Sequence, residues 1–230
     1  MNKDRENVLI GIVAFLLYFV QSLFQYVPLK IMGIDYSQMN LNSKIIYLLC
    51  YELVFILVLF LIYRKIFIHD IKDFIKNFKN YIKKYMEYWA LAFGLMIISN
   101  LIIVSILPNA VATNQENVNA IFSIAPIYMI ISAVFFAPII EEVTFRLSIR
   151  NIIKNDTIFI IISGLIFGGL HVIGSFENLI DLIYIIPYSI PGFVFAYTLV
   201  KSKNIFVPIS LHFFHNGFTM IMQLILSLLV

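Results

Sequence analysis

The chain has 230 residues, of which 61% are hydrophobic and only 13% are charged. Soluble domains carry about 25% charged residues, so no water-soluble fold could hide this much apolar surface. The net charge of +3 comes from basic residues scattered between apolar runs, which argues against a nucleic-acid partner. The composition therefore predicts a single all-α integral membrane domain over residues 1–230.

Seven apolar windows approach the length of about 20 residues that a helix needs to cross a bilayer. They are 8–27, 45–63, 88–107, 127–153, 157–174, 179–200 and 205–229. The first window is too long for a signal peptide and lacks a clear cleavage site, so we expect it to be retained as a helix. The windows predict a polytopic bundle of about seven transmembrane helices, with six to eight as the range.

The distribution of basic residues predicts the orientation of the chain. If the amino terminus lies in the cytoplasm, fourteen of the sixteen Lys and Arg residues fall on the cytoplasmic side, and only Lys30 and Lys44 lie outside. Basic loops remain cytoplasmic. We therefore expect a multi-pass protein of the cell membrane with a cytoplasmic amino terminus.

Two stretches between the windows have distinct compositions. Residues 64–87 place six apolar residues at three- and four-residue steps among lysines: Ile68, Ile71, Phe74, Ile75, Phe78 and Ile82. This pattern predicts a basic amphipathic helix that contacts membrane lipid at the headgroup level. Residues 109–119 are the most polar stretch, and we expect an outer loop there.

Ionisable residues within the apolar windows are the candidates for function, because such groups are costly in a bilayer and usually mark sites. In a helix, Glu142 and Arg146 are four residues apart and can form an ion pair, whereas Glu141 points about 100 degrees away. One carboxylate is then paired and the other remains available. From this segment alone, both glutamates could equally end the helix at the membrane surface.

Histidines follow on two later windows. His171 comes after Gly164, Gly168 and Gly169, which permit close helix approach. A lone histidine on an apolar helix is more often an interhelical hydrogen-bonding residue than a catalyst.

On the last window, His212 and Asn216 are one turn apart and share a face. His215 lies within about 60 degrees of them, as a supporting partner or an alternative ligand.

The polar residues on these three windows share a similar predicted depth in the bilayer. Glu141, His171, His212 and Asn216 lie between 7 and 14 residues from the predicted cytoplasmic ends of their windows, or roughly 10 to 21 Å into the bilayer. The four residues therefore lie at a similar depth in the bilayer. The orientation that gives this depth depends on the distribution of Lys and Arg alone, so it is independent of these residues. The agreement favours a shared polar site over a surface cap.

The ordered set EExxxR, FxxxH and HxxxN on successive windows resembles the CPBP family of intramembrane proteases. That family contains the enzymes that trim prenylated CaaX proteins and the bacterial Abi proteins linked to bacteriocin processing and immunity. The resemblance covers roughly residues 125–222, which would be the protease core. It implies an intramembrane endopeptidase with the catalytic residues Glu141, His171, His212 and Asn216 and the supporting residues Glu142 and Arg146.

The resemblance implies that Glu141 activates a water together with His171, while His212 and Asn216 stabilise the oxyanion. Metal-assisted hydrolysis is the competing mechanism, in which Glu141, His171 and His212 would bind zinc. The cofactor is accordingly none or Zn. We favour the glutamate-and-water mechanism because no helical HExxH motif is present and Asn216 suits an oxyanion donor better than a zinc ligand.

The expected substrate is a hydrophobic, lipidated or membrane-associated peptide or protein. Enrichment in Ile, Lys and Asn is typical of an AT-rich bacterial genome, which favours a peptide or membrane-protein segment over a prenylated substrate. The alternative is a non-catalytic immunity or scaffold protein with the same fold, but such a protein would be expected to have lost a catalytic residue. A transporter is less favoured because no inverted repeat is visible.

Overall fold

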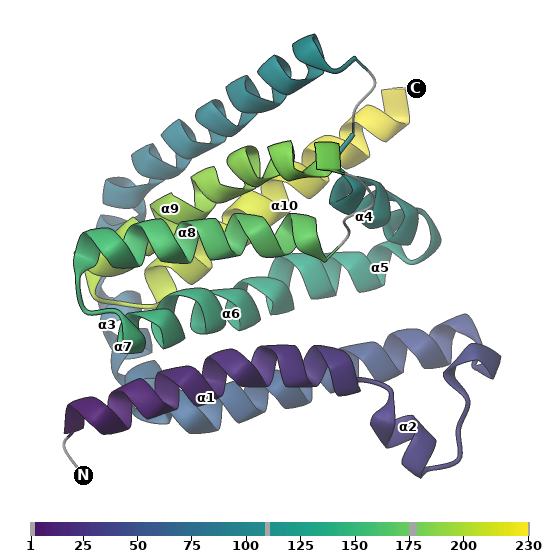
Figure 1. Ribbon diagram of the computed structural model, residues 1–230, viewed down its shortest axis with the longest axis horizontal. Helices are drawn as coiled ribbons and strands as arrows, with labels where there is room; N and C mark the ends of the chain where they lie inside the picture. The colour runs from purple at the N-terminus through teal and green to yellow at the C-terminus, as the bar shows by residue number, and fades with distance from the viewer. Residues whose placement is uncertain (1–2, 109–110, 175–178, 230) are drawn as a thin grey trace.

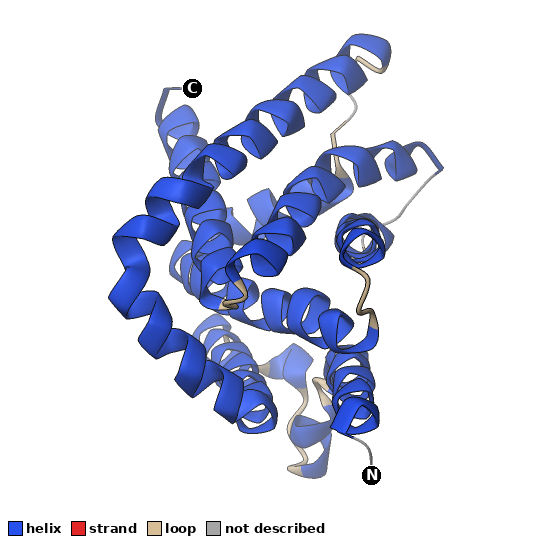
Figure 2. Cartoon of the chain, turned by 90° about the vertical axis from the view of Figure 1, so that its left-hand side faces the viewer, coloured by secondary structure: helices blue, strands red, loops and turns tan. Residues whose placement is uncertain are grey.

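The computed structural model describes residues 3–108, 111–174 and 179–229, with side chains described from residue 4 to residue 225. All regular structure in this part of the chain is helical, as Figures 1 and 2 show. The predicted all-α class is therefore confirmed.

The first half of the chain contains the helices α1 (Lys3–Phe24), α2 (Val27–Ile31), α3 (Leu41–Ile106) and α4 (Thr113–Ile124), with a 3₁₀ turn at Tyr36–Gln38. The next span runs without a break through α5 (Pro126–Met129), a first π segment (Ile130–Phe136), α6 (Ala137–Glu142), a second π segment (Val143–Ser148) and α7 (Ile149–Ile152). The chain ends with α8 (Asp156–Ile173), a 3₁₀ helix (Leu179–Tyr184), α9 (Ile185–Ser202) and α10 (Phe206–Leu229).

Five helices of the described chain are long and apolar enough to cross a membrane. They are Asp4–Phe24, Leu41–Ile106, Pro126–Ile152, Asp156–Ile173 and Leu179–Ser202. The second of these contains two of the seven predicted windows. The helix α10 matches the seventh window, but its polar residues keep it outside this set.

The helix α3 joins two predicted spans through the basic segment, residues 64–87. At 66 residues it is roughly 100 Å long, far more than the thickness of a bilayer, so it must bend. The backbone of Tyr63 departs from helical angles at the start of the basic segment, and Figure 2 shows α3 curving around the bundle.

The basic segment packs against the start of α10 on one side. There the ring of Phe74 lies 6.1 Å from the ring of Phe206, and the Asn204 side chain donates to the Asp70 carbonyl (2.8 Å). Ile75 and Phe78 of the same segment are exposed. Interfacial placement of this exposed face stays a prediction.

The polar stretch 109–119 is not the loop that we expected. From Thr113 onward it is helical and forms most of α4. Its polar residues bond both along the helix, as in the 2.8 Å bond from the Gln115 amide to Asn119, and to other elements, as in the 3.3 Å bond from Asn114 to the Tyr188 hydroxyl. Polarity alone therefore does not indicate a loop. Residues 109 and 110 of the expected loop lie outside the described part of the chain.

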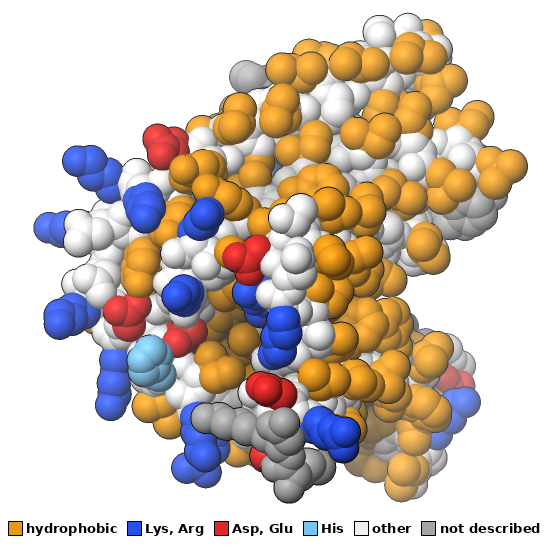
Figure 3. Space-filling view, turned by 60° about the vertical axis from the view of Figure 1, so that its left-hand side comes forward, with side chains coloured by type: hydrophobic (Ala, Val, Ile, Leu, Met, Phe, Trp, Pro, Cys, Tyr) orange, Lys and Arg blue, Asp and Glu red, His pale blue; other side chains and the backbone are white. Residues whose placement is uncertain are grey.

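The interior of the bundle is formed mainly by α8, α9 and the second π segment. Only 11% of the most apolar stretch of α1 and of α3 is buried within the protein, against 39% for α8 and 44% for Leu179–Ser202. Figure 3 shows hydrophobic side chains over much of the visible surface, with charged side chains gathered toward one side. An apolar exterior of this kind is suited to lipid.

Glycines permit the close approach of α8 and α9. A Cβ on Gly164 would lie 2.1 Å from the Phe193 ring, and one on Gly168 would lie 2.1 Å from Ser189 Oγ and 2.7 Å from the Ser189 nitrogen. The predicted role of these two glycines in helix packing is confirmed. This contact fixes the end of α8 that carries His171.

Candidate active site

Three side chains from α6, α8 and α10 meet in the interior of the bundle. Glu141 Oε2 lies 3.9 Å from His171 Nε2 and 3.8 Å from His212 Nε2. The side chains of Glu141 and His171 retain 17% and 24% exposure, whereas His212 retains 3%. Residues separated by up to 71 positions in the sequence therefore lie close together in the fold.

The second nitrogen of each imidazole is held by an acceptor. His171 Nδ1 lies 2.9 Å from the Phe167 carbonyl oxygen, and His212 Nδ1 lies 2.8 Å from Glu142 Oε1. A carbonyl or carboxylate oxygen can only accept, so Nδ1 carries a proton in both rings. Both Nε2 atoms are thereby directed toward Glu141.

Glu142 links two elements in a fully buried network. Its Oε2 forms an ion pair with Arg146 Nε at 3.0 Å, and its Oε1 accepts from His212. The Arg146 guanidinium also lies 4.3 Å from the centre of the Phe167 ring. The predicted Glu142–Arg146 pair is present, and it does more than hold its own helix, because it fixes the ring of His212 on α10.

Asn216 faces the first π segment. Its Nδ2 donates to the Ala133 carbonyl oxygen at 2.8 Å. His215 is turned instead toward α3, where its Nδ1 accepts from Trp89 Nε1 at 3.3 Å. His212, His215 and Asn216 thus contact three different elements, although they occupy little more than one turn of α10.

Glu52 is an ionisable residue within an apolar window that we did not single out from the sequence. Its Oε1 accepts from Ser132 Oγ at 2.8 Å and from the Tyr128 hydroxyl at 3.3 Å. The sequence alone could have indicated that Glu52 has polar partners, because a carboxylate within the predicted second span is costly without them. Glu52 connects α3 to the first π segment, next to the carbonyl that holds Asn216.

The donor types of Glu141, His171 and His212 suit a catalytic zinc ion. Their spacing does not, because ligand atoms at the usual zinc distances would lie about 3.3 to 3.5 Å apart around a tetrahedral ion. Within residues 3–108, 111–174 and 179–229, no group of three His, Cys, Asp or Glu side chains is placed so that it could hold a metal ion. As they lie, these side chains do not fit direct zinc coordination.

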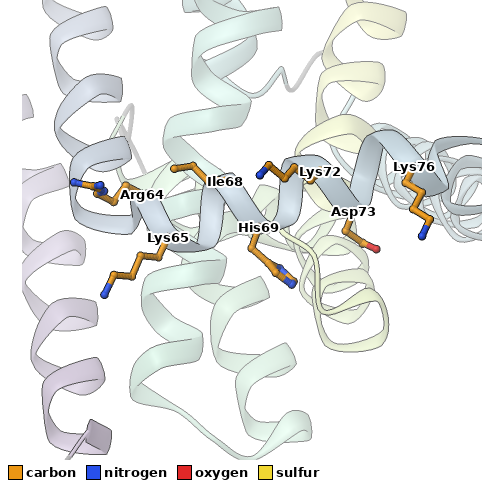
Figure 4. A pocket seen from close by; sticks show the side chains of 7 residues that line it. All are labelled: Arg64, Lys65, Ile68, His69, Lys72, Asp73 and Lys76. Atoms are coloured by element: carbon orange, nitrogen blue, oxygen red, sulfur yellow. The ribbon is translucent and has the colours of Figure 1, made fainter.

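A separate open groove of about 590 Å³ lies along the basic segment of α3. Figure 4 shows its lining side chains: Arg64, Lys65, Ile68, His69, Lys72, Asp73 and Lys76. All of them come from one helix, and none belongs to the Glu141 site. The groove is a charged surface feature, separate from the candidate active site in its lining residues.

Comparison with known proteins gives matches concentrated on the part that carries this site. Residues 123–218 match the model of a family described as type II CAAX prenyl endopeptidase Rce1-like. The chain is 34% identical over 120 residues to a Bacillus subtilis protein named "Putative membrane peptidase YdiL", covering 50% of this chain and 46% of the relative. No solved structure matches.

Two further relatives show similar identity. A Staphylococcus aureus protein named membrane-embedded CAAX protease MroQ is 32% identical over 152 residues, covering 60% of this chain and 58% of the relative. An uncharacterized protein of Mycoplasma capricolum is 36% identical over 98 residues, covering 40% of this chain and 28% of the relative. The chain thus spans between 28% and 58% of the length of these curated relatives.

The matched range runs from the end of α4 into α10. It contains Glu141, His171, His212 and Asn216, and the motifs EExxxR, FxxxH and HxxxN fall within it in that order. The family is one of membrane proteases. Over residues 123–218 this chain is therefore similar to the Rce1-like CAAX prenyl endopeptidase family.

Proposed function

We propose that this protein is an intramembrane endopeptidase that hydrolyses a peptide bond of a hydrophobic, lipidated or membrane-associated peptide or protein. The observation that carries the proposal is the position of Glu141 Oε2. This oxygen is buried, has no hydrogen-bond partner among the described residues, and lies 3.8 and 3.9 Å from two imidazole nitrogens. A carboxylate held in this way is suited to accept a proton from a water molecule.

In the first step, the attacking water lies between Glu141 and His171. The Nε2 lone pair of His171 accepts one hydrogen of the water and orients it, because Nδ1 already donates to the Phe167 carbonyl. Glu141 accepts the other proton as the water oxygen bonds to the substrate carbonyl carbon. The π electrons of that carbonyl move onto its oxygen, which becomes an oxyanion.

The oxyanion is stabilised by donors on α10. Donation from His212 Nε2 requires a hydrogen on that nitrogen in addition to the one on Nδ1, which bonds to the Glu142 carboxylate. Asn216 provides a neutral amide N–H. Each preorganised donor contributes about 3 to 4 kcal/mol to the transition state. When the C–N bond breaks, the protonated Glu141 returns its proton to the leaving amine.

The proposal is tested by comparing bacterial membranes that contain the wild-type chain with membranes that contain Glu141→Gln. Mass spectrometry of membrane-associated peptides should show uncleaved precursors that accumulate in the variant and products that occur only with the wild type. Glu87→Gln is the matched control, because Glu87 is an exposed glutamate of α3. Identical peptide profiles for wild type and Glu141→Gln would argue for a non-catalytic scaffold instead.

The role of metal requires a second measurement. With Glu141 as the direct base, purified active protein should contain no stoichiometric zinc and should keep its activity in chelator. Stoichiometric zinc in active protein, with activity that is lost to chelator and restored by the metal, would replace this mechanism with a metal-assisted one.

A further inference from the structure

The first π segment has an unusual break in its hydrogen bonding. In a π-helix each N–H donates to the carbonyl five residues earlier, and the bond from the Ala137 nitrogen to the Ser132 carbonyl follows this rule. The next bond in the same register would run from residue 138 to Ala133. Residue 138 is a proline and has no N–H.

The missing N–H leaves the Ala133 carbonyl without its backbone donor at membrane depth, where no bulk water can replace the bond. The Asn216 side chain provides the donor, with Nδ2 2.8 Å from the Ala133 oxygen. Because a carbonyl oxygen only accepts, the amide nitrogen of Asn216 must face Ala133. The orientation of this amide therefore follows from the chemistry of its partner.

An asparagine amide has two N–H groups, and Ala133 uses one of them. The second N–H is held in a fixed direction by the first bond. The two elements also pack closely around this contact, since the rings of Phe135 and Phe213 lie 4.7 Å apart and a Cβ on Gly217 would lie 3.5 Å from Val134 Cγ1. The amide is thus fixed by both a hydrogen bond and packing.

We infer that Pro138 is a positioning residue for the reaction: by leaving the Ala133 carbonyl unpaired, it makes that carbonyl orient the Asn216 amide toward the substrate oxyanion. The inference rests on the proposed function for the role of Asn216. Pro138 itself contacts no reacting atom and acts through the backbone oxygen that it leaves without a donor.

The test is Pro138→Ala, which restores an N–H able to bond to the helix and compete with Asn216. We expect kcat to fall about 10-fold to 100-fold, with KM changed by less than about twofold, because a misplaced catalytic group affects the transition state more than substrate binding. Pro126→Ala is the matched control in the same continuous helix. Pro126 occupies the first turn, where no N–H is needed, so this variant should keep wild-type kinetics.

A double-mutant cycle separates positioning from a general structural effect. In the Asn216→Ala background, Pro138→Ala should cause no further loss of kcat, because the residue through which it acts is absent. An equal loss of kcat in both backgrounds would overturn the inference. If Pro138→Ala does not fold, Pro138→Ser restores the same N–H with a different side chain.

A second readout does not depend on activity. In protein labelled with ¹⁵N-asparagine, the Asn216 side-chain amide signal, assigned by its loss in Asn216→Asp, should shift and exchange faster with water in Pro138→Ala but not in Pro126→Ala. If that change occurs in a protein that cleaves nothing, the positioning holds and the proposed function fails. If the wild type cleaves substrate and both proline variants match it in kinetics and spectrum, the positioning is wrong.

Discussion

At the residue scale, two adjacent glutamates have different surroundings and so should respond differently to the same substitution. Glu142 pairs with buried Arg146 and accepts from His212, whereas Glu141 Oε2 has no hydrogen-bond partner among the described residues. Glu142→Gln removes the charge that compensates Arg146, and breaking a buried pair in this way destabilises by about 3 to 5 kcal/mol. Glu141→Gln removes no such pair.

We therefore expect a clearly lower melting temperature for Glu142→Gln and a nearly unchanged one for Glu141→Gln. Thermal unfolding of both variants in the same detergent measures the difference. Equal melting temperatures for the two variants would contradict the assigned network, and Glu87→Gln reports the effect of removing an exposed carboxylate.

The candidate residues themselves could be predicted, because polar side chains are conspicuous in apolar windows and Glu142 and Arg146 have helical spacing. Their partners could not. The bonds from His212 to Glu142 and from Asn216 to Ala133 depend on the rotation of α10 relative to a span that contains two π segments, which no ideal helical periodicity describes. His215, expected on the same side as His212, bonds instead to Trp89.

At the element scale, the contact between α8 and α9 positions His171. Gly168→Ala would place a Cβ 2.1 Å from Ser189 Oγ and 2.8 Å from the Ile185 carbonyl oxygen, so the two helices must separate. We expect lower stability by about 1 to 3 kcal/mol, as for overpacking in a core, and a large loss of cleavage.

Gly94→Ala is the control for this substitution, since nothing lies within 4 Å of the added methyl group. It should be neutral or slightly stabilising, because alanine favours the helix over glycine. Unfolding and cleavage measured on both variants test the prediction. If Gly168→Ala proves as harmless as Gly94→Ala, α8 and α9 do not approach as closely as described.

The basic segment of α3 offers a prediction on pH. Burial and the hydrogen bond to Asp73 raise the pKa of Tyr81 from 10.0 to about 12, and the bonds from Tyr81 and Asn204 lower the pKa of Asp73. For Tyr81 the folded pKa lies above the unfolded value. Its stabilising contribution is therefore complete below pH 10.0 and is lost as the pH rises through about 12.

The difference in phenolate absorbance between the wild type and Tyr81→Phe isolates this one tyrosine among the 13 in the chain. Its midpoint should lie near pH 12 and should decrease in Asp73→Asn. A midpoint near 10.0 in the folded protein would show that the segment is not bonded to Asp73 as described.

The hydropathy of the sequence predicts the positions of the helices, but it does not predict how consecutive helices are connected. The windows 45–63 and 88–107 are spans of a single bent helix, because the amphipathic stretch between them continues the helical turn without a proline or glycine to end it. The short 3₁₀ helix at Leu179–Tyr184 could not be distinguished from the start of the sixth window, since both are apolar.

At the scale of the whole molecule, the amino-terminal helices share a core with the family-matched domain. The Tyr18 ring lies 5.0 Å from the Phe145 ring, and the Tyr63 hydroxyl lies 3.0 Å from Ser148 Oγ. Gly11 approaches the Ser148 carbonyl so closely that a Cβ would lie 2.6 Å from it. Residues 123–218 therefore pack directly against α1 and α3.

Deletion of residues 1–26 should accordingly reduce the folded protein recovered from membranes and expose Phe145. Size-exclusion chromatography and thermal unfolding of the truncated chain measure this. A truncated protein with the melting temperature and activity of the full chain would show that α1 is dispensable and that the matched domain is sufficient.

In the proposed mechanism Glu141 is the base that activates the attacking water. The most direct measurement is single-turnover cleavage of an identified substrate by purified protein in lipid nanodiscs, for the wild type and for Glu141→Gln. We expect a rate lower by about 10²-fold to 10⁴-fold in the variant, the range of general acid–base catalysis, with an unchanged melting temperature. Cleavage at the wild-type rate by folded Glu141→Gln would contradict this mechanism.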